Sequence, residues 1–393
     1  MSPTGSLILS ASIAGFGYHP SAPRHPRRLV ELAHYRRLVQ TAERARLDFV
    51  LLHDLRAAPD DLAFGRLDAL SVLSRLAPET SRVGLAVGRP TTYSEPFTVS
   101  RELATLDFVS GGRAAWNATT TASDAEAQNY GSDTAPAADE RRAIAEEYIE
   151  VSRKLWDSWE DGAVITDRER GLYLDPNKLH HINHAGRHFR IRGPQITYRP
   201  PQGHVVVVQV DGGDPGEPLS AALADVLVLH HESLEDARRA YARHRDEAAA
   251  AGRTVRVLQS ILPVLGATES EARARAAELD AAAAQQGARA WPRAARLVGT
   301  PGQVADRLAQ WFGAGAADGF HLWPAVLPEG LEELADGLVP ELQRRGLFRR
   351  DYAGRTLREH LRLPRPDSQY AGAPSEAHTA YDTPITGPER KTA

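Results

Sequence analysis

The side chains best suited to bind a ligand lie in one polar stretch in the first third of the chain. Asn117 and the threonines at 119–121 follow a short apolar segment, residues 113–116. Residues 110–112, Ser-Gly-Gly, precede that segment and favour a sharp turn, because glycine tolerates left-handed backbone. Hydrogen-bonding side chains after a buried strand are typical of a ligand site at the carboxyl end of a parallel sheet. A polar turn that bonds only its own backbone is the competing interpretation.

An acid follows another apolar run. Residues 47–52 read as a strand, and His53 and Asp54 come directly after it. A carboxylate at this position either faces a ligand at the strand end or caps the next helix. The residues alone leave both interpretations open, and a role for His53 is less well supported still.

Four histidines gather in a later stretch, at His180, His181, His184 and His188. Their spacing does not follow a helix, and no cysteine or carboxylate completes a metal set within that stretch. We therefore predict no metal site, and expect a hairpin whose histidines line a substrate channel.

The composition excludes several classes of function. The chain has 393 residues, a net charge of −4 and no cysteine. Without a basic face, nucleic acid and anionic membranes are not expected partners, and thiol chemistry is excluded. We find no signal peptide and no apolar run of the roughly 20 residues that would span a bilayer. A cytoplasmic enzyme is the expectation.

The remaining elements alternate between strands and helices. Helical spacing of apolar residues is clear at 31–46. Trp323 either points toward the barrel mouth or packs in the core, and we expect the core. A chain of this length accommodates one large α/β barrel with additions. Expected strands lie at 7–13, 47–52, 82–87, 113–116, 204–210, 224–229, 255–265 and 319–322.

The stretch from Leu106 to Gly131 resembles the signature of the bacterial-luciferase-like flavin monooxygenases, in their nitrilotriacetate, pristinamycin and dibenzothiophene-sulfone monooxygenase branch. Tyr130 and Thr121 stand where the branch usually has phenylalanine and serine. Two further blocks resemble the branch. One lies near Gly299 and the other runs from Leu155 to Gly203, so the likeness covers nearly the whole chain. The signature positions that fit are Leu106, Asp107, Ser110, Gly112, Arg113, Trp116, Asn117, Thr120, Asn129 and Gly131.

The resemblance implies an α/β fold, a TIM (β/α)8 barrel with a long insertion between strands 4 and 5 and a C-terminal tail. It implies a two-component monooxygenase. A separate flavin reductase would supply reduced FMN, which reacts with dioxygen, and one oxygen would pass to a small organic substrate. A homodimer or homotetramer is expected. The Ala- and Arg-rich composition indicates a GC-rich, actinobacterial genome, and in such a genome we expect a role in secondary metabolism.

The resemblance also assigns site residues. It places Asp54, Thr91, Thr92, Asn117 and Thr121 beside the flavin ring and ribityl chain, and Arg142, Gly213 and Gly216 at the phosphate. No catalytic residue is assigned, because the flavin carries the reaction.

The expected phosphate site departs from the branch. A usual serine near Gly213 is missing, and Asp211, Asp214 and Glu217 bring negative charge that should repel a phosphate. Arg142, where the branch has tyrosine, would either compensate through paired charged hydrogen bonds or lie as a surface arginine on a helix. The alternative is a family member with lost or altered flavin binding: a cofactor-independent or deazaflavin-dependent oxidoreductase, or a non-catalytic subunit.

The expected domain organisation is simple. Residues 1–363 form the barrel, with the insertion at 162–203. Residues 364–393 are rich in Pro, Ser, Thr and Gly and form a flexible tail, or an arm that lies on a neighbouring subunit.

Overall fold

A computed structural model describes residues 5–23, 26–54, 57, 65–120, 123–169, 171–211, 220–285 and 294–372. Three predicted site residues, Thr121, Gly213 and Gly216, lie outside these ranges, as do Asp214 and Glu217.

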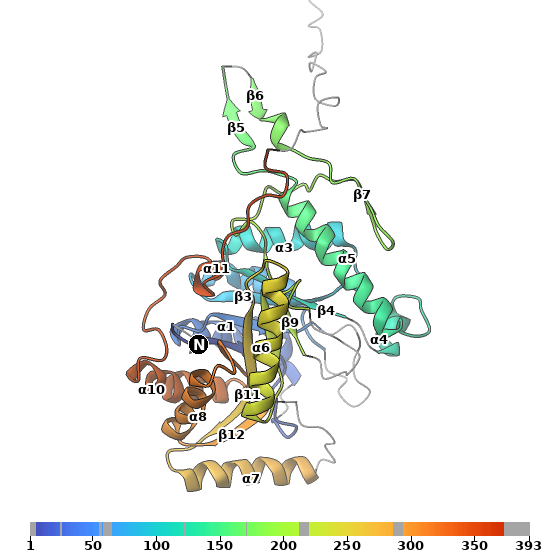
Figure 1. Ribbon diagram of the computed structural model, residues 1–393. Coiled ribbons are helices and arrows are strands. Elements are labelled where there is room, and N and C mark those ends of the chain that lie inside the picture. The colour runs from blue at the N-terminus through green and yellow to red at the C-terminus, as the bar shows by residue number, and fades with distance from the viewer. Residues whose placement is uncertain are drawn as a thin grey trace, which may run out of the picture.

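Eight parallel strands close into a barrel, which confirms the predicted fold (Figure 1). The last strand pairs with both the first strand and the seventh, so the ring has no open edge. Another parallel strand, β12 (Ala295–Gly299), lies outside the ring and pairs with the carboxyl half of the seventh strand. The barrel strands are β1 (Ile8–Ser12), β2 (Phe49–Leu52), β3 (Gly84–Pro90), β4 (Ala114–Thr119), β9 (Val206–Val210), β10 (Val226–Leu229), β11 (Arg256–Leu265) and β13 (Gly319–Leu322).

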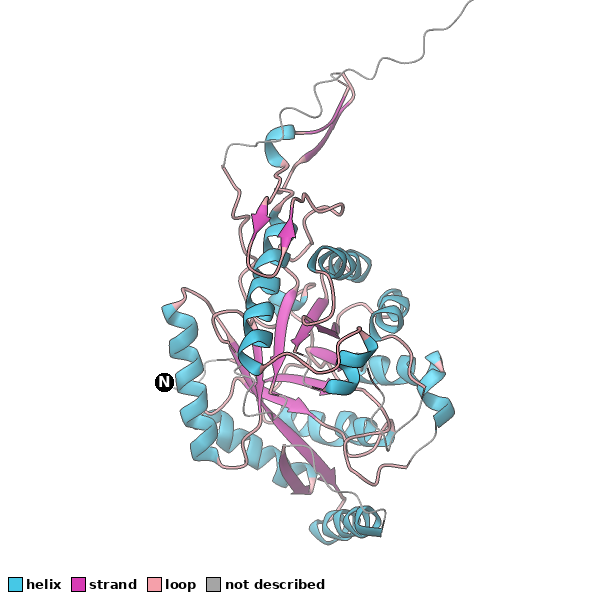
Figure 2. Ribbon diagram, turned by 90° about the vertical axis from the view of Figure 1, so that its right-hand side faces the viewer, coloured by secondary structure: helices cyan, strands magenta, loops and turns pink. Residues whose placement is uncertain are grey.

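Helices surround the barrel (Figure 2). Residues that alternate along each strand point outward and join the helices in one large apolar cluster, as Leu9, Val50 and Trp116 do. The α-helices around the barrel are α1 (Leu32–Arg44), α2 (Ala69–Leu76), α3 (Pro96–Ser110), α6 (Leu234–Ala250), α7 (Glu269–Gln285), α8 (Pro301–Gly313), α9 (Glu329–Glu333) and α10 (Val339–Arg344). Two short 3-10 helices, η1 (Pro26–Val30) and η2 (Ala77–Glu79), and a π-helical segment, η4 (Leu334–Leu338), accompany them.

A short helix closes the amino-terminal end of the barrel. Leu357 begins α11 (Leu357–His360), whose first turn is held by reciprocal hydrogen bonds between Thr356 and Glu359. Leu357, with two further leucines of the same segment, packs against the first inward-facing residues of the strands, including Ile8 and Phe49. The floor of the barrel is therefore sealed and apolar, and a ligand must enter from the carboxyl end.

The chain leaves the barrel between β4 and β9, where the insertion was predicted. This excursion contains α4 (Asp124–Asn129), α5 (Ala138–Asp157), β5 (Val164–Asp167), β6 (Leu172–Leu174), η3 (Pro176–Lys178), β7 (His184–Ala185) and β8 (Arg190–Ile191). The β5–β6 hairpin projects away from the barrel (Figure 1).

The first residues of the predicted tail pack on this excursion. Arg365 pairs with Asp161, and the Tyr370 ring stacks on His180 with the ring centroids 5.0 Å apart. From residue 373 onward the tail lies outside the described residues.

Candidate functional site

The barrel interior changes from apolar to polar toward the carboxyl ends of the strands. Its lower layers are filled by Val, Leu, Ile, Phe and Ala side chains. Nearer the carboxyl end, hydrogen-bonding side chains replace them on several strands. These are Ser12, His53, Asn117, Ser260 and His321.

Asn117 is the clearest ligand-binding candidate among the predicted residues. Ala115, two positions earlier on β4, belongs to the interior cluster, and Trp116 belongs to the outer one. The period-two alternation of a strand therefore directs Asn117 into the barrel. Its exposed fraction is 0%, yet neither its amide nitrogen nor its oxygen has a hydrogen-bond partner within the described residues. A buried amide without partners is costly unless a ligand completes its hydrogen bonds.

Four side chains, from β1, β13 and the residue that follows β2, form a continuous line of hydrogen bonds. Ser10 Oγ lies 2.7 Å from His321 Nδ1, and His321 Nε2 lies 2.8 Å from Ser12 Oγ. Ser12 Oγ in turn lies 3.1 Å from His53 Nε2. Sequence reasoning assigned no role to this chain. The polar residues Ser10, Ser12 and His321 stand out within expected apolar strands, which could have indicated a buried polar group. Their two strands, β1 and β13, are far apart in sequence, so nothing local showed that they meet.

Both histidines of this chain are neutral near pH 7. Burial, reinforced by the positive charge of Arg66 and by His230, lowers the pKa of His53 to about 4. Burial also lowers the pKa of His321 well below its usual value. Each ring therefore presents one N–H and one lone pair to its neighbours.

Aromatic rings form part of the wall above this chain. The Trp323 ring lies 4.6 Å from Tyr18 and 5.3 Å from His230, measured between ring centroids. Trp323 was expected in the core, but it contacts the interior residue His321 instead, with a buried indole N–H that has no partner within the described residues.

Asp54 is engaged in an ion pair at the end of β2. One Arg89 nitrogen lies 3.0 Å from the Asp54 carboxylate and 3.1 Å from Asp68, the residue that caps α2. Alternation along β2 gives the inward position to His53, which contacts Ser12, and not to Asp54. The predicted flavin contact of Asp54 remains a prediction.

The predicted threonines lie next to β4. Thr91 is buried and donates from its hydroxyl to the carbonyl oxygen of Thr119, 3.2 Å away, while Thr92 is partly exposed. Thr91 and Asn117 therefore lie on neighbouring strand ends, and their contact with a flavin stays a prediction.

Arg142 is directed toward solvent on α5. Its side chain is 48% exposed and pairs with Asp139 on the same helix. The adjacent Arg141 is buried, donates to the carbonyl of Pro136 and lies near Tyr93, which stacks on Tyr130. Because Thr121, Gly213 and Gly216 are outside the described residues, the predicted phosphate end stays a prediction.

Most signature residues that we identified in the sequence build the fold. Asp107 accepts from the Ala114 amide and from Gln202, and burial raises its pKa to about 6. Arg113 donates to backbone carbonyls of 77, 80, 83 and 110, and Trp116 Nε1 donates to the Arg89 carbonyl. Asn117 alone of these faces the interior.

The four histidines of the insertion have separate partners. His180 pairs with Glu160, His181 with the Gly193 carbonyl, His184 with Glu147, and His188 with Glu140. Across the described ranges, no cluster of His, Asp or Glu has an arrangement that could hold a metal ion.

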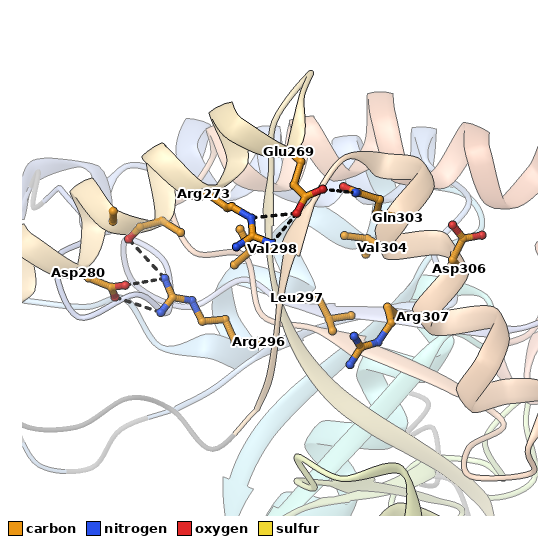
Figure 3. A pocket seen from close by; sticks show the side chains of 12 residues that line it. Glu269, Arg273, Asp280, Arg296, Leu297, Val298, Gln303, Val304, Asp306 and Arg307 are labelled. Carbon is orange, nitrogen blue, oxygen red and sulfur yellow. Dashed lines mark hydrogen bonds and ion pairs between the residues drawn. The ribbon is translucent and has the colours of Figure 1, made fainter.

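Two cavities of the described structure lie outside the barrel. One, of about 720 Å³, lies between α7, β12 and α8, where Arg273 pairs with Glu269 and Arg296 with Asp280 (Figure 3). The other, of about 760 Å³, lies between α5, the β7 region and residues 220–223. Neither is lined by Ser12, His53, Asn117 or His321, so both are separate from the candidate site at the barrel mouth.

None of the helices in the described ranges is long and apolar enough to cross a bilayer.

Comparisons with known proteins agree with this architecture. The family model described as luciferase-like monooxygenase matches residues 10–318. The chain is 34% identical to N-acetyl-S-(2-succino)cysteine monooxygenase of Bacillus subtilis (strain 168), over 93% of this chain and 98% of that protein. It is 36% identical to nitrilotriacetate monooxygenase component A of Aminobacter aminovorans, over 90% and 94% of the two chains.

A solved structure extends the likeness to three dimensions. EDTA monooxygenase from Chelativorans sp. BNC1 superposes with a TM-score of 0.81 at 30% identity, covering 92% of this chain and 99% of that one. The protein therefore belongs to the luciferase-like monooxygenase family, and it is a flavin-dependent oxidoreductase.

Proposed function

We propose that this protein is the oxygenase component of a two-component monooxygenase that uses reduced FMN and dioxygen to oxidise a small organic substrate. The observation that carries the proposal is Asn117, a buried amide without partners among the residues that the structure describes, at the carboxyl end of a barrel whose other end is sealed.

The residues of the mouth fit a flavin. An amide side chain supplies both a donor and an acceptor, which match the alternating carbonyl and N–H groups at the edge of the flavin ring. Asn117, with Thr91 and Thr92, would hold the ring and its side chain. When bound, reduced FMN supplies the reactivity toward dioxygen, and no protein nucleophile is needed.

The chain itself contributes an enclosed, oriented site. The apolar lower layers and the α11 seal exclude water from below. Tyr18 and Trp323 add large rings at the wall. The neutral His53 adds a polar group without adding charge. These features support an oxygen transfer that must be protected from water.

An anionic substrate suits the charge at this mouth. Arg66 lies near His53 and Tyr18, and it forms no ion pair within the described residues. The names of two relatives and of the solved structure specify polycarboxylate substrates: a succino-cysteine, nitrilotriacetate and EDTA. We propose a small carboxylate-bearing substrate, with Arg66 as a counter-charge.

A separate reductase completes the proposed system. The name of one relative, component A, denotes part of a multicomponent enzyme, and two others are subunits A and B of pristinamycin IIA synthase. A flavin reductase gene beside this one would support the assignment. A homodimer or homotetramer, to be measured by light scattering, and a role in secondary metabolism stay predictions.

Titration with flavins tests the proposal. Oxidised and photoreduced FMN should both bind, and mixing the reduced complex with dioxygen and nitrilotriacetate or a related carboxylate should yield oxidised product. Absence of binding at high micromolar FMN would remove the proposal. Binding of a deazaflavin alone would favour the alternative of a hydride-transferring enzyme.

Arg142→Ala examines the predicted phosphate contact in the same assay. A dissociation constant that does not change would assign Arg142 to the surface, as its exposure suggests.

A further inference from the structure

The hydrogen-bonded chain inside the barrel leads from a fully buried hydroxyl to the mouth. Ser10, Ser12 and His321 each have an exposed fraction of 0%, whereas His53, which follows β2 directly, is partly exposed. The three hydrogen bonds of 2.7, 2.8 and 3.1 Å join these side chains in a single line.

The number of available hydrogens decides which group donates in each of these hydrogen bonds. Within the described residues, the Ser10 hydroxyl has one hydrogen bond, with His321 Nδ1. A buried hydroxyl must use its hydrogen, so Ser10 donates and Nδ1 accepts. The single hydrogen of the neutral His321 ring is then on Nε2, which donates to Ser12 Oγ.

The same count fixes the tautomer of His53. Ser12 accepts from His321, and the Tyr18 hydroxyl, which also faces Ser12, carries a hydrogen that it can donate to the second lone pair of Ser12 Oγ. The hydrogen of Ser12 is then available for His53 Nε2. The neutral His53 ring must therefore carry its hydrogen on Nδ1. Nδ1 makes no hydrogen bond with any part of the chain that the structure describes.

Burial is the main reason why both rings stay neutral, and the surrounding positive groups add to it. The groups that act on His53 are the Arg66 guanidinium and the rings of His230 and His321. Asp54, the next residue, is paired with Arg89, so it does not favour a charged His53 ring. A neutral N–H is thus presented at the strand ends.

We propose that His53 contacts the ligand, donating a hydrogen bond from Nδ1 to an acceptor atom of the molecule bound in the barrel mouth. Ser12, His321 and Ser10 are positioning residues that fix its tautomer. The inference rests on the proposed function for the identity of that molecule, a flavin carbonyl or nitrogen or a substrate carboxylate. The tautomer is a property of the ligand-free protein.

Nitrogen NMR of the full chain, labelled with ¹⁵N-histidine, tests the positioning. An imidazole nitrogen that bears hydrogen is well separated in shift from one that does not, and His53→Asn assigns the signals. We expect Nδ1–H at His53 in the ligand-free protein. Ser12→Ala and His321→Gln should each give a mixture of tautomers. Ser152→Ala, a matched buried serine that donates to the Tyr148 carbonyl on α5, should leave the His53 signals unchanged.

Two results would overturn the positioning. One is hydrogen on Nε2 of His53 in the unmodified protein. The other is a tautomer that survives both substitutions in the chain. If one variant fails to fold, the other still decides the question, and the spectrum of the unmodified protein is independent of both.

Ligand addition tests the contact and identifies its source. A shift of the His53 Nδ1 signal with FMN alone assigns the acceptor to the flavin. A shift with nitrilotriacetate, and not with FMN, assigns it to a carboxylate substrate. If neither probe moves the signal the contact is refuted, while quenching of FMN fluorescence reports separately whether the proposed function holds.

Affinity gives a second readout. For the probe that shifts the signal, His53→Phe should weaken binding about 3- to 30-fold, and His53→Gln, which keeps an N–H donor, should stay closer to the unmodified protein. Equal affinity in the phenylalanine variant would contradict the contact.

Discussion

Replacing Asn117 by leucine should stabilise the ligand-free protein and lower its affinity for FMN. Asn117 is fully buried, and both polar atoms of its amide lack partners in the described structure. Leucine has nearly the same shape and no polar atom. The substitution therefore removes a desolvation cost without opening a cavity, at the expense of the groups that would bind the cofactor.

The size of each effect follows from the hydrogen-bond inventory. An unsatisfied buried polar group costs about 1–3 kcal/mol, so we expect a gain of about 1–3 kcal/mol in the free energy of unfolding. An unfolding entropy of about 2.1 cal/mol/K per residue gives about 0.8 kcal/mol per degree for a chain of 393 residues. The melting temperature should therefore rise by about 1–4 °C. Loss of the hydrogen bonds should weaken FMN binding by about 5- to 150-fold.

Thermal melts of the ligand-free protein and FMN fluorescence quenching measure the two effects on one sample. Asn177→Leu is the matched control, because Asn177 lies on η3 of the insertion, where its side chain bonds Asp175 at the surface. That variant should not gain stability and should bind FMN unchanged. A destabilised Asn117→Leu that still binds FMN normally would refute the reasoning, since the amide would then serve the fold.

Three further predictions concern the scaffold. Arg113→Met should lower the free energy of unfolding by about 3–5 kcal/mol in urea titrations, because Arg113 is 2% exposed and its loss leaves several buried carbonyls unpaired; a loss below 1 kcal/mol would contradict this. Leu357→Ala should cost about 2–5 kcal/mol by the same method, because it opens a cavity in the barrel floor, whereas truncation of an exposed leucine such as Leu172 should cost far less. Burial raises the pKa of Glu147, but His184 and the amides of residues 188 and 189 outweigh it and bring the pKa to about 2. Since this folded value lies below the ordinary 4.5, Glu147 contributes stability above pH 4.5 that is lost as the pH falls toward 2. Glu147→Gln should flatten stability against pH in that window and speed hydrogen exchange at residues 184–191; exchange that stays slow would show that the carboxylate does not hold the hairpin.

The signature that revealed the family serves mainly the scaffold. Asp107 bonds across the turn between α3 and β4, Arg113 joins that turn to the segment before β3, and Trp116 bonds to the Arg89 carbonyl on β3. Of the described signature residues, only Asn117 reaches the interior. The residues around the signature also show how far local pattern reaches. Phe108 and Val109 continue the apolar run of α3, yet they are 42% and 51% exposed. Leu103 and Leu106 face the core, and the helical period turns the other two outward.

Neighbouring residues in a strand or helix differ in what they face, and sequence alone did not decide between them. Asp54 stays a predicted flavin contact, while the pleat of β2 gives the inward direction to His53 and pairs Asp54 with Arg89. Arg142 stays a predicted phosphate ligand, while the turn of α5 exposes its side chain and buries that of Arg141. In a strand, a one-residue error in the predicted register exchanges the side chains that face the barrel interior with those that face the helices.

By itself the sequence determined the barrel, the family and the polar strand ends, because alternating strands and helices and a contiguous signature are local patterns. Only the tertiary structure decided which side chains meet inside the barrel. Ser10 and Ser12 lie more than three hundred residues from His321 in the chain, and closure of β1 against β13 brings them together. Contacts between such distant residues depend on strand pairing, and no local spacing in the sequence records which strands pair.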